Sequence, residues 1–396
     1  MDKALTYLPL FSSVKVLGLL ANVSGATYKT MRAVMREDPG MEYQAVLRTK
    51  ASSSGAALGY GPESRRYLGG SLASYRLSAY VFGSLGRFRK RLKRLVEETG
   101  ADVVHAFGAP DDMGVIAKSG TEVPVIHEVF DMTSLYDLDT YGMPREDSLL
   151  NILGLHRLTR PLVIRRELEW EEYVHRNCEA LVYTSEYMLE AAREKYGDFR
   201  SVVVPNAVLK EDIPKQRLPK LSSKDNGAHA VYVGQIELKP SHRRILPLLR
   251  DITETGVNVH LYPTSSNPRV RDEVFQSCTE NPRMHWHDPL PYKRLLTELT
   301  QYDCGLILLS PANERLLNVA MPNKMFEYLV AGLPVGVSPY RSLIDFVEKN
   351  RCGGVLRSAE DVREIASDRP DVEFKDEYTI DFHIGRLTDL YGELAS

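Results

Sequence analysis

One short stretch decides the fold prediction, and it reads Met321-Pro322-Asn323-Lys324-Met325-Phe326-Glu327-Tyr328-Leu329-Val330-Ala331-Gly332-Leu333-Pro334-Val335. Pro322 suits the first residue of a helix, because its missing N–H would be unpaired there anyway. Gly332 ends that helix and Pro334 prevents its continuation, so Val335–Val337 begins a strand. The stretch therefore predicts a short helix followed by a strand. Its start offers free backbone N–H groups and a positive dipole end, which favour an anion.

Two charged residues lie on this predicted helix. Lys324 is in the first turn, where a cation opposes the helix dipole at a cost of a few tenths of a kcal/mol unless an anion neutralises it. Glu327 follows one turn later on the same side. A surface ion pair between the two, worth about 0.2–0.5 kcal/mol, is the alternative to a binding role. Their spacing alone leaves both interpretations open.

Short apolar runs alternate with helical stretches on both sides of this segment. Most runs are continuously apolar, as expected for strands buried on both faces of a parallel sheet, and the segments between them suit crossover helices. The sequence predicts an α/β protein with two Rossmann-like, doubly wound parallel-sheet domains that face a cleft. The predicted strands are Val14–Leu20, Tyr43–Leu47, Val103–Ala106, Val123–Val129, Ala180–Thr184, Val202–Val204, Ala230–Val233, Val257–Tyr262, Met284–His287, Cys304–Leu309, Val335–Val337 and Gly354–Leu356.

A change in composition marks the predicted domain boundary. Residues 210–227 hold prolines and a polar run, so we expect a linker that few contacts cross. The first domain is then 1–209 and the second 228–378. In open α/β sheets, ligands bind beyond the carboxyl ends of the strands. The loops that follow the strands are therefore the places to look for a site.

Length and composition exclude several classes of protein. The chain has 396 residues, enough for two domains, and its 43% hydrophobic and 26% charged residues are ordinary for a globular protein. A formal charge of −3 gives no basic field for nucleic acid. The four cysteines show no zinc-site spacing, so we predict no metal and a reduced, cytoplasmic protein. We identify neither a signal peptide nor a run of about 20 apolar residues for a membrane span.

The segment 322–335 resembles the donor-binding helix of GT-B glycosyltransferases, particularly those of glycosyltransferase family 4. Other segments resemble that family in the same order. They are Asp102–Phe107, Pro124–Asp131, Leu181–Glu186, Val204–Val208, Ala230–Ile236, Trp286–Tyr292 and Tyr302–Leu306. The resemblance implies a GT-B fold whose C-terminal helix, 379–396, crosses back to the first domain.

The same resemblance implies an activity. It is transfer of a sugar from a nucleotide diphospho-sugar, UDP- or GDP-linked, to a hydroxyl acceptor that is a glycan, a lipid-linked molecule or a small molecule. Retention of the anomeric configuration is implied, without a cofactor or an essential metal. Alternatives are a nucleotide-sugar epimerase of the same fold and a non-catalytic nucleotide-sugar binder.

Donor-site residues are predicted at the family's matching positions, with Glu327 on the ribose hydroxyls. They are Gly234, Gln235, Lys239, Pro263, Thr264, His287, Leu290, Asn323, Lys324 and Glu327. Arg243 and Arg244 are alternatives to Lys239 for the diphosphate charge, and we expect Trp286 to be a core residue. The chain departs from the family at Gln235, where an arginine is frequent, and at Val319, where a glutamate is frequent.

For the reaction itself we single out His105 and Asp131, which we expect to follow strands of the first domain and to face the cleft. His105 suits a base near neutral pH, and Asp131 suits an acceptor hydroxyl or the orientation of His105. A hydrogen-bonded structural histidine and a helix-capping aspartate are the alternatives. Asp111 and Asp112 are predicted helix caps.

The sharpest charge cluster is Arg87–Arg94. We expect an amphipathic helix that packs on the sheet through Phe88, Leu92 and Leu95 with a solvated basic face. A contact with anionic lipid or with an anionic acceptor is the alternative. The predicted location is therefore cytoplasmic, with peripheral attachment to the inner membrane face as the alternative.

Overall fold

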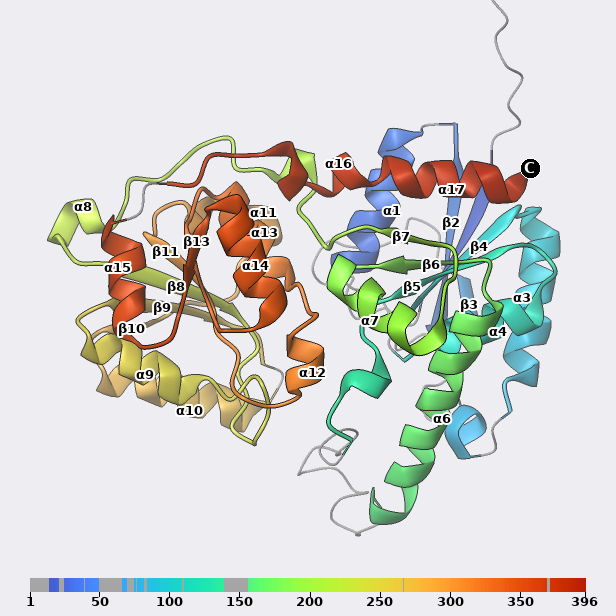
Figure 1. The fold of residues 1–396 in the computed structure, drawn as a ribbon, viewed down its shortest axis with the longest axis horizontal. Helices are drawn as coiled ribbons and strands as arrows, with labels where there is room; N and C mark the ends of the chain where they lie inside the picture. Colours follow the sequence, from blue (N-terminus) through green and yellow to red (C-terminus); the bar gives the residue numbers. More distant parts are fainter. Residues whose placement is uncertain are drawn as a thin grey trace, which may run out of the picture.

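The computed structural model describes residues 14–20, 25–38, 40–49, 66–69, 75, 77–81, 84–108, 110–138, 156–265, 267–368 and 371–396. Its strands form two parallel sheets with helices packed against them, which lie side by side in Figure 1. The predicted fold class, two doubly wound α/β units, is confirmed.

The first sheet has seven strands in the order β3-β2-β1-β4-β5-β6-β7. Their bounds are β1 (Lys15–Leu20), β2 (Glu42–Thr49), β3 (Arg66–Gly69), β4 (Val103–Gly108), β5 (Val125–Val129), β6 (Ala180–Tyr183) and β7 (Ser201–Val203). In β1 every residue after Lys15 is buried, as expected for a strand covered on both faces. The strand order reverses between β1 and β4, which is where such sheets bind ligands.

Helices pack against this sheet. They are α1 (Gly25–Glu37), α3 (Gly86–Thr99), α4 (Asp112–Gly120), α6 (His156–Asn177) and α7 (Glu186–Tyr196), with short turns η2 (Leu77–Val81) and η3 (Thr133–Leu135). In α3 the buried side chains are Phe88, Leu92, Leu95 and Val96, which share one face. The predicted amphipathic helix at 87–94 is therefore present, with its basic residues turned away from the core.

The second sheet has six strands in the order β10-β9-β8-β11-β12-β13. Their bounds are β8 (His229–Gly234), β9 (Asn258–Pro263), β10 (Met284–Trp286), β11 (Cys304–Ile307), β12 (Val335–Val337) and β13 (Gly353–Val355). Its helices are α9 (Leu246–Glu254), α10 (Pro268–Glu280), α11 (Tyr292–Leu299), α12 (Glu314–Leu317), α13 (Asn323–Val330), α14 (Arg341–Asn350) and α15 (Glu360–Asp368). The order reverses between β8 and β11, so the switch point lies at the end of β8.

One described strand was not predicted. β3 has four residues, Arg66–Gly69, and forms the outer edge of the first sheet beside β2. Such a short edge strand has no sustained apolar run for a sequence pattern to detect.

The segment predicted as the linker, 210–227, makes hydrogen bonds to the second half of the chain, and its place as the domain boundary stays a prediction. This segment contains η4 (Lys210–Asp212) and α8 (Ser222–Asp225) and is held against the second half of the chain. The N–H of Leu218 donates to Thr300 Oγ1 at 2.9 Å, and Lys220 Nζ donates to the carbonyl of Tyr302 at 2.6 Å. The polar side chains that suggested a loose connection instead pair with helix and loop groups.

The C-terminal segment returns to the first sheet. After η5 (Asp376–Tyr378), α16 (Ile380–His383) and α17 (Gly385–Ala395) lie against α1, and α17 also contacts β4. Figure 1 shows this red segment running from the second half of the molecule to the first. Leu387, Leu390 and Tyr391 are its buried residues.

Loops at the carboxyl ends of the two sheets contact each other. Ser185, after β6, donates its hydroxyl to the carbonyl of Val319 at 2.6 Å. The N–H of Asp137, beyond β5, donates to Asn313 Oδ1 at 2.8 Å. Since Asn313 and Val319 both follow β11, the carboxyl edges of the two sheets face one another. Among the described residues, no helix is long and apolar enough to cross a membrane.

Candidate functional site

Helix α13 begins at the switch point of the second sheet. Pro322 is its N-cap rather than its first residue, which is Asn323, and no side chain caps this end by a hydrogen bond. Opposite it, β8 ends at Gly234, whose φ of 138° is one that L side chains rarely adopt. A Cβ on Gly234 would lie 3.1 Å from Lys324 Nζ. The glycine therefore leaves room for the lysine head at the start of the helix.

Lys324 is held in an unusual environment for an ammonium group. Its Nζ lies 3.9 Å from the centre of the Tyr232 ring, and among the described residues it has no hydrogen bond or ion pair. Burial lowers the pKa of Lys324 to about 7, opposed by Glu327 and reinforced by Arg243. A cation–π contact offsets only part of the cost of removing this charge from water. The site thus contains a cation that an anion would stabilise.

Glu327 does not form the surface pair with Lys324 that its spacing allows. It is 9% exposed, and its nearest cation is Lys29 of α1, with Nζ 3.8 Å from Oε1. The surface ion-pair interpretation is therefore wrong. The carboxylate is a buried group that the first half of the chain also contacts.

The loop after β8 brings Arg243, rather than Lys239, to this region. Arg243 donates to the side-chain oxygen of Gln235, and its charge influences both Lys324 and Asp131. Lys239 is exposed, and within the described ranges it has no hydrogen bond or ion pair. Of the loop cations considered from the sequence, the geometry favours Arg243.

A cavity of about 360 Å³ lies beside this loop. Gln235, Pro263 and Thr264 line it, as do Trp286 and Pro289. The N–H of Thr264 also donates to the carbonyl of Gly234 at 3.0 Å, which joins the cavity to the end of β8. Trp286 packs on the core and also lines the cavity, so the expectation of a purely core residue is incomplete.

Two residues predicted for the same pocket, His287 and Leu290, lie in the loop after β10. The Leu290 side chain packs against the hydrophobic core, and the His287 ring stacks on Tyr262 with ring centres 4.7 Å apart. Pro289 of the same loop lines the cavity. The contact of the backbone around His287 and Leu290 with the base stays a prediction.

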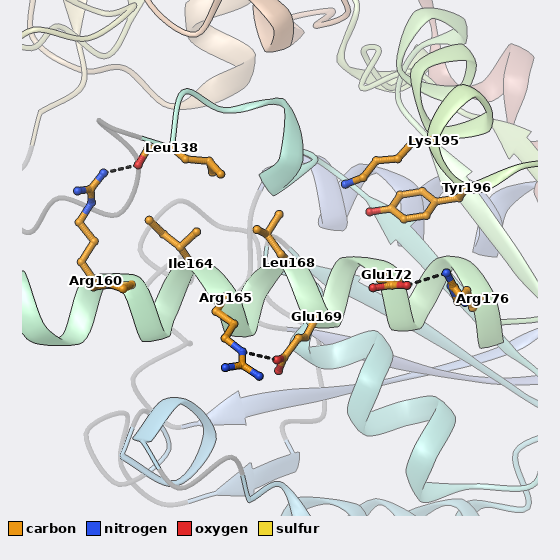
Figure 2. A pocket seen from close by; sticks show the side chains of 11 residues that line it. Leu138, Arg160, Ile164, Arg165, Leu168, Glu169, Glu172, Arg176, Lys195 and Tyr196 are labelled. Carbon is orange, nitrogen blue, oxygen red and sulfur yellow. Dashed lines mark hydrogen bonds and ion pairs between the residues drawn. The ribbon is translucent and has the colours of Figure 1, made fainter.

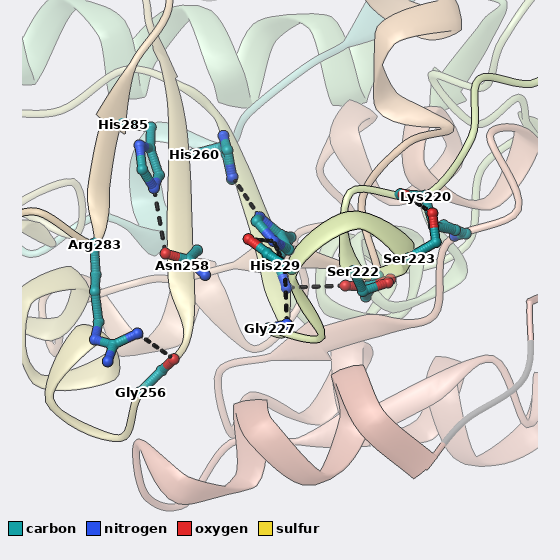
Figure 3. Close-up of polar contacts among 12 residues, drawn as sticks. Lys220, Ser222, Ser223, Gly227, His229, Gly256, Asn258, His260, Arg283 and His285 are labelled. Carbon is teal, nitrogen blue, oxygen red and sulfur yellow. Dashed lines mark hydrogen bonds and ion pairs between the residues drawn. The ribbon is translucent and has the colours of Figure 1, made fainter.

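His287 belongs to a chain of hydrogen-bonded histidines across the second sheet, part of which Figure 3 shows. His287 Nε2 lies 2.9 Å from His260 Nδ1, and His260 Nε2 lies 2.9 Å from His229 Nδ1. The carboxylate of Asp225 lies 3.1 Å from His229 Nε2. With Asp225 accepting from His229 Nε2, donation from Nε2 of each ring to Nδ1 of the next satisfies all of these contacts. Burial and the neighbouring histidines lower the pKa of His260 to about 2.

His105 is not at the end of its strand. It lies within β4, its side chain is fully buried, and Nδ1 is 2.6 Å from the hydroxyl of Tyr391 in α17. Burial lowers the pKa of His105 well below its ordinary value. The expectation that His105 faces the cleft as a base is wrong. The sequence could not reveal that the C-terminal helix covers it.

Asp131 is positioned as expected, directly after β5 and half-buried. The Tyr136 hydroxyl donates to Asp131 Oδ2 at 3.2 Å. Burial raises the pKa of Asp131 to about 6, against the attraction of Arg243 from the other half of the molecule. The carboxyl group therefore changes its protonation near neutral pH at the facing edges of the two sheets.

Asp111 and Asp112 precede and begin α4, but no side-chain cap hydrogen bond forms there. Asp111 Oδ1 instead lies 2.7 Å from His127 Nε2, and Asp112 accepts from Tyr75. The predicted capping roles are wrong. Both carboxyl groups are hydrogen-bonded to buried residues of other elements, which the local sequence could not show.

A larger cavity of about 710 Å³ lies along α6 (Figure 2). Its apolar lining comes from Leu138, Pro161, Ile164 and Leu168, and charged residues surround these. Most of the charged side chains pair locally. Examples are Arg165 with Glu169 at 2.9 Å and Arg176 with Glu172 at 2.7 Å.

Among the described residues, no cluster of histidine, cysteine or carboxylate side chains is grouped to hold a metal ion. Metal independence of the reaction stays a prediction.

Comparison with known proteins places these features in context. Residues 53–211 match the model of the family described as Glycosyltransferase Family 4. A search of curated proteins by sequence finds no match.

Solved structures align with nearly the whole chain at low sequence identity. Sucrose-phosphate synthase from Thermosynechococcus elongatus has a TM-score of 0.62 and 11% identity, covering 96% of each chain. Anabaena HepE in complex with UDP has a TM-score of 0.57 and 14% identity, covering 96% of this chain and 97% of that one. UDP-GlcNAc 2-epimerase from Methanocaldococcus jannaschii has a TM-score of 0.53 and 10% identity, covering 96% and 100%. The protein has the GT-B fold and resembles the glycosyltransferases of family 4.

Proposed function

We propose that the protein transfers a sugar from a nucleotide diphospho-sugar to a hydroxyl acceptor. One observation carries this proposal. At the switch point of the second sheet, the uncapped start of α13 presents Lys324 and Glu327 beside the Gly234 turn. This is the place where open α/β sheets bind ligands. The family match of residues 53–211 supports the same class of reaction.

The charges at this place support a diphosphate. Departure of a nucleoside diphosphate requires stabilisation of its developing negative charge. Lys324 supplies a largely desolvated ammonium, Arg243 lies near it, and the helix start adds backbone N–H groups of Asn323 and Lys324. A diphosphate beside Lys324 would favour the ammonium form and remove the cost of its burial.

Glu327 and the cavity beside the loop after β8 supply the remaining donor contacts in this proposal. Glu327 accepts hydrogen bonds from the ribose hydroxyls, a role that the family resemblance assigns to this position. The cavity lined by Gln235, Pro263 and Thr264 takes the base. UDP- and GDP-sugars are the donors we favour, and the structural likeness to Anabaena HepE in complex with UDP supports a uridine nucleotide.

Asp131 is the acceptor-side residue of this proposal. It lies on the facing edge of the first sheet, and its pKa of about 6 makes it a carboxylate that can accept a proton from a hydroxyl group at neutral pH. The exposed basic face of α3 is proposed to contact anionic lipid, which would bring a lipid-linked acceptor to the enzyme. Retention of configuration is part of the proposal.

Thermal unfolding in the presence of UDP, GDP, ADP and TDP tests donor binding. A ligand bound only by the folded protein stabilises it by about 2.7 kcal/mol at 100 times its Kd. We expect at least one nucleotide to raise Tm and Glu327→Ala to abolish the rise. Glu364→Ala, an exposed position in α15, is the control and should keep it. If none of the four nucleotides raises Tm, the proposal is wrong.

An epimerase is the second candidate, supported by the structural likeness to a UDP-GlcNAc 2-epimerase. Such an enzyme changes the sugar without an acceptor. Incubation with the nucleotide-sugar alone, followed by NMR of the sugar protons, separates the two candidates. A new epimer favours the second, and nucleoside diphosphate release that depends on an added acceptor favours the first.

A further inference from the structure

A buried lysine of the first sheet's helix layer reaches the donor-site carboxylate. Lys29 in α1 is 3% exposed, and its Nζ lies 3.8 Å from Glu327 Oε1. The ammonium also lies 4.9 Å from the centre of the Tyr292 ring. Within the described part of the chain, Nζ has no hydrogen-bond partner. An ammonium group so enclosed and so poorly paired is rare and calls for an explanation.

Packing alone does not explain a lysine at this position. Its neighbours Thr30 and Met31 are buried, whereas Arg36 on the same helix is exposed and pairs with Asp381 at 3.1 Å. A methionine would fill the space of Lys29 without the cost of burying a charge, and buried ion pairs often add little stability over apolar residues. Burial lowers the pKa of Lys29, opposed chiefly by Glu327 and then by Asp212.

The charges around Lys29 leave Glu327 as its counter-ion. Asp212 of η4 is already paired with Lys293 of α11, with Nζ 2.9 Å from Oδ1. Tyr292 presents its ring face to the ammonium group. Lys324, one turn before Glu327 on α13, is drawn to the same carboxylate. One buried carboxylate therefore attracts two lysines, each from a different half of the molecule.

We propose that Lys29 is a positioning residue for the sugar donor. It holds the Glu327 carboxylate from the opposite half of the protein and directs it toward the ribose, while Lys324 remains available to the diphosphate. This inference rests on the proposed function. It implies that the ribose contact requires α1 as well as α13, so the donor site is completed by both halves of the chain.

A double-mutant cycle tests this role. The proteins are the wild type, Lys29→Met, Glu327→Gln and the double variant, and calorimetry measures their affinity for UDP and for uridine. If the thermal screen selects GDP, guanosine and GDP replace them. We expect Lys29→Met to weaken nucleoside and nucleotide by the same factor, about tenfold. In the Glu327→Gln background the same change should have little further effect, because the two residues act as one unit.

Three further proteins complete the experiment. Lys29→Arg keeps the charge and should recover part of the affinity. Lys349→Met, at an exposed lysine near the end of α14, is the matched control and should bind UDP as the wild type does. Circular dichroism checks that each variant folds, and Lys29→Gln replaces the methionine variant in the cycle if that variant does not.

The outcomes separate this inference from the proposed function. Unchanged affinity in Lys29→Met, or additive effects in the cycle, would overturn the role of Lys29 while donor binding stands. Weaker binding of UDP with unchanged uridine would place Lys29 on the diphosphate and also overturn it. If the wild type binds neither compound nor any other nucleotide, the proposed function itself is wrong.

Discussion

The two sheets hold similar polar residues in different states. In the first sheet, His105 and Glu128 lie inside β4 and β5 and are 0% and 1% exposed. Burial lowers the pKa of His105 well below its ordinary value and raises that of Glu128 to about 8, so both are uncharged at pH 7. In the second sheet, burial lowers the pKa of Lys324 only to about 7, so about half of its amine groups are charged at pH 7.

This difference separates structural from functional polar groups. The first sheet buries its titratable groups in uncharged form, which costs far less than burying a charge, and His105 Nδ1 is hydrogen-bonded to the Tyr391 hydroxyl of α17. At the second sheet Lys324 keeps part of its charge at pH 7, and its partners among the described residues are the ring face of Tyr232 and the nearby Glu327 carboxylate. A charge left incompletely paired next to a switch point indicates a ligand better than the switch point alone does.

The largest effect that we expect concerns Glu128. Its pKa is about 8 in the folded protein and 4.5 in the unfolded chain. The contribution of its neutral form to stability is therefore complete below pH 4.5 and is lost as the pH rises to 8. Glu128→Gln removes the loss and should raise the free energy of unfolding by about 4 kcal/mol at pH 8, and by little at pH 4.5. Urea unfolding at both pH values measures it.

Glu348→Gln, at an exposed position in α14, is the control for that experiment and should change neither value. If Glu128→Gln also leaves the free energy of unfolding unchanged at pH 8, Glu128 is ionised in the folded protein. The first sheet would then also carry a buried charge, and the contrast between the two sheets would disappear.

Lys324→Met tests the other side of the comparison. We expect it to weaken UDP binding about 100-fold, equivalent to about 2.7 kcal/mol. The unliganded protein should lose no stability, because the variant no longer buries a cation. Calorimetry gives the affinity and urea unfolding gives the stability. Lys349→Met, near the end of α14, should bind as the wild type does. Wild-type affinity in Lys324→Met would show that the diphosphate lies elsewhere.

The histidine chain makes the second half sensitive to acid. The pKa of His260 falls from 6.5 to about 2 on folding, so its contribution to stability is complete above pH 6.5 and is lost as pH falls below it. Near pH 5 the loss reaches about 2 kcal/mol. His260→Gln should flatten the pH dependence of unfolding between pH 7.5 and 5. His383→Gln, at a histidine that is not part of this hydrogen-bonded series, should leave most of the pH dependence. Equal slopes in wild type and His260→Gln would contradict the assignment.

Much of the fold was predictable because strands buried on both faces are continuous apolar runs. The strand Val335–Val337 was predicted with its observed bounds, and most of the others within about two residues. The helix that follows Pro322 was equally clear, since proline and glycine mark its ends. The edge strand β3 was missed because four residues carry no period.

The site was predictable only where its residues are close in sequence. Lys324 and Glu327 lie on one helical turn and belong to a recognisable segment. Lys29 lies in another helix almost 300 positions away, and its only local signal is a lysine among buried positions of α1. The burial of His105 depends on Tyr391 of α17, which no pattern near residue 105 reveals.

The smallest expected effect distinguishes two cations of the loop after β8. Arg243 contacts Gln235 and acts on both Lys324 and Asp131, whereas Lys239 is exposed. Arg243→Gln should therefore weaken UDP binding about fivefold, and Lys239→Gln should leave it within about twofold, since solvent and salt screen an exposed charge. Calorimetry at low and physiological salt measures both. A larger effect of Lys239→Gln would mean that the loop moves when the donor binds and exchanges one cation for the other. The open edge of the second sheet would then be shaped by its ligand, rather than formed in advance.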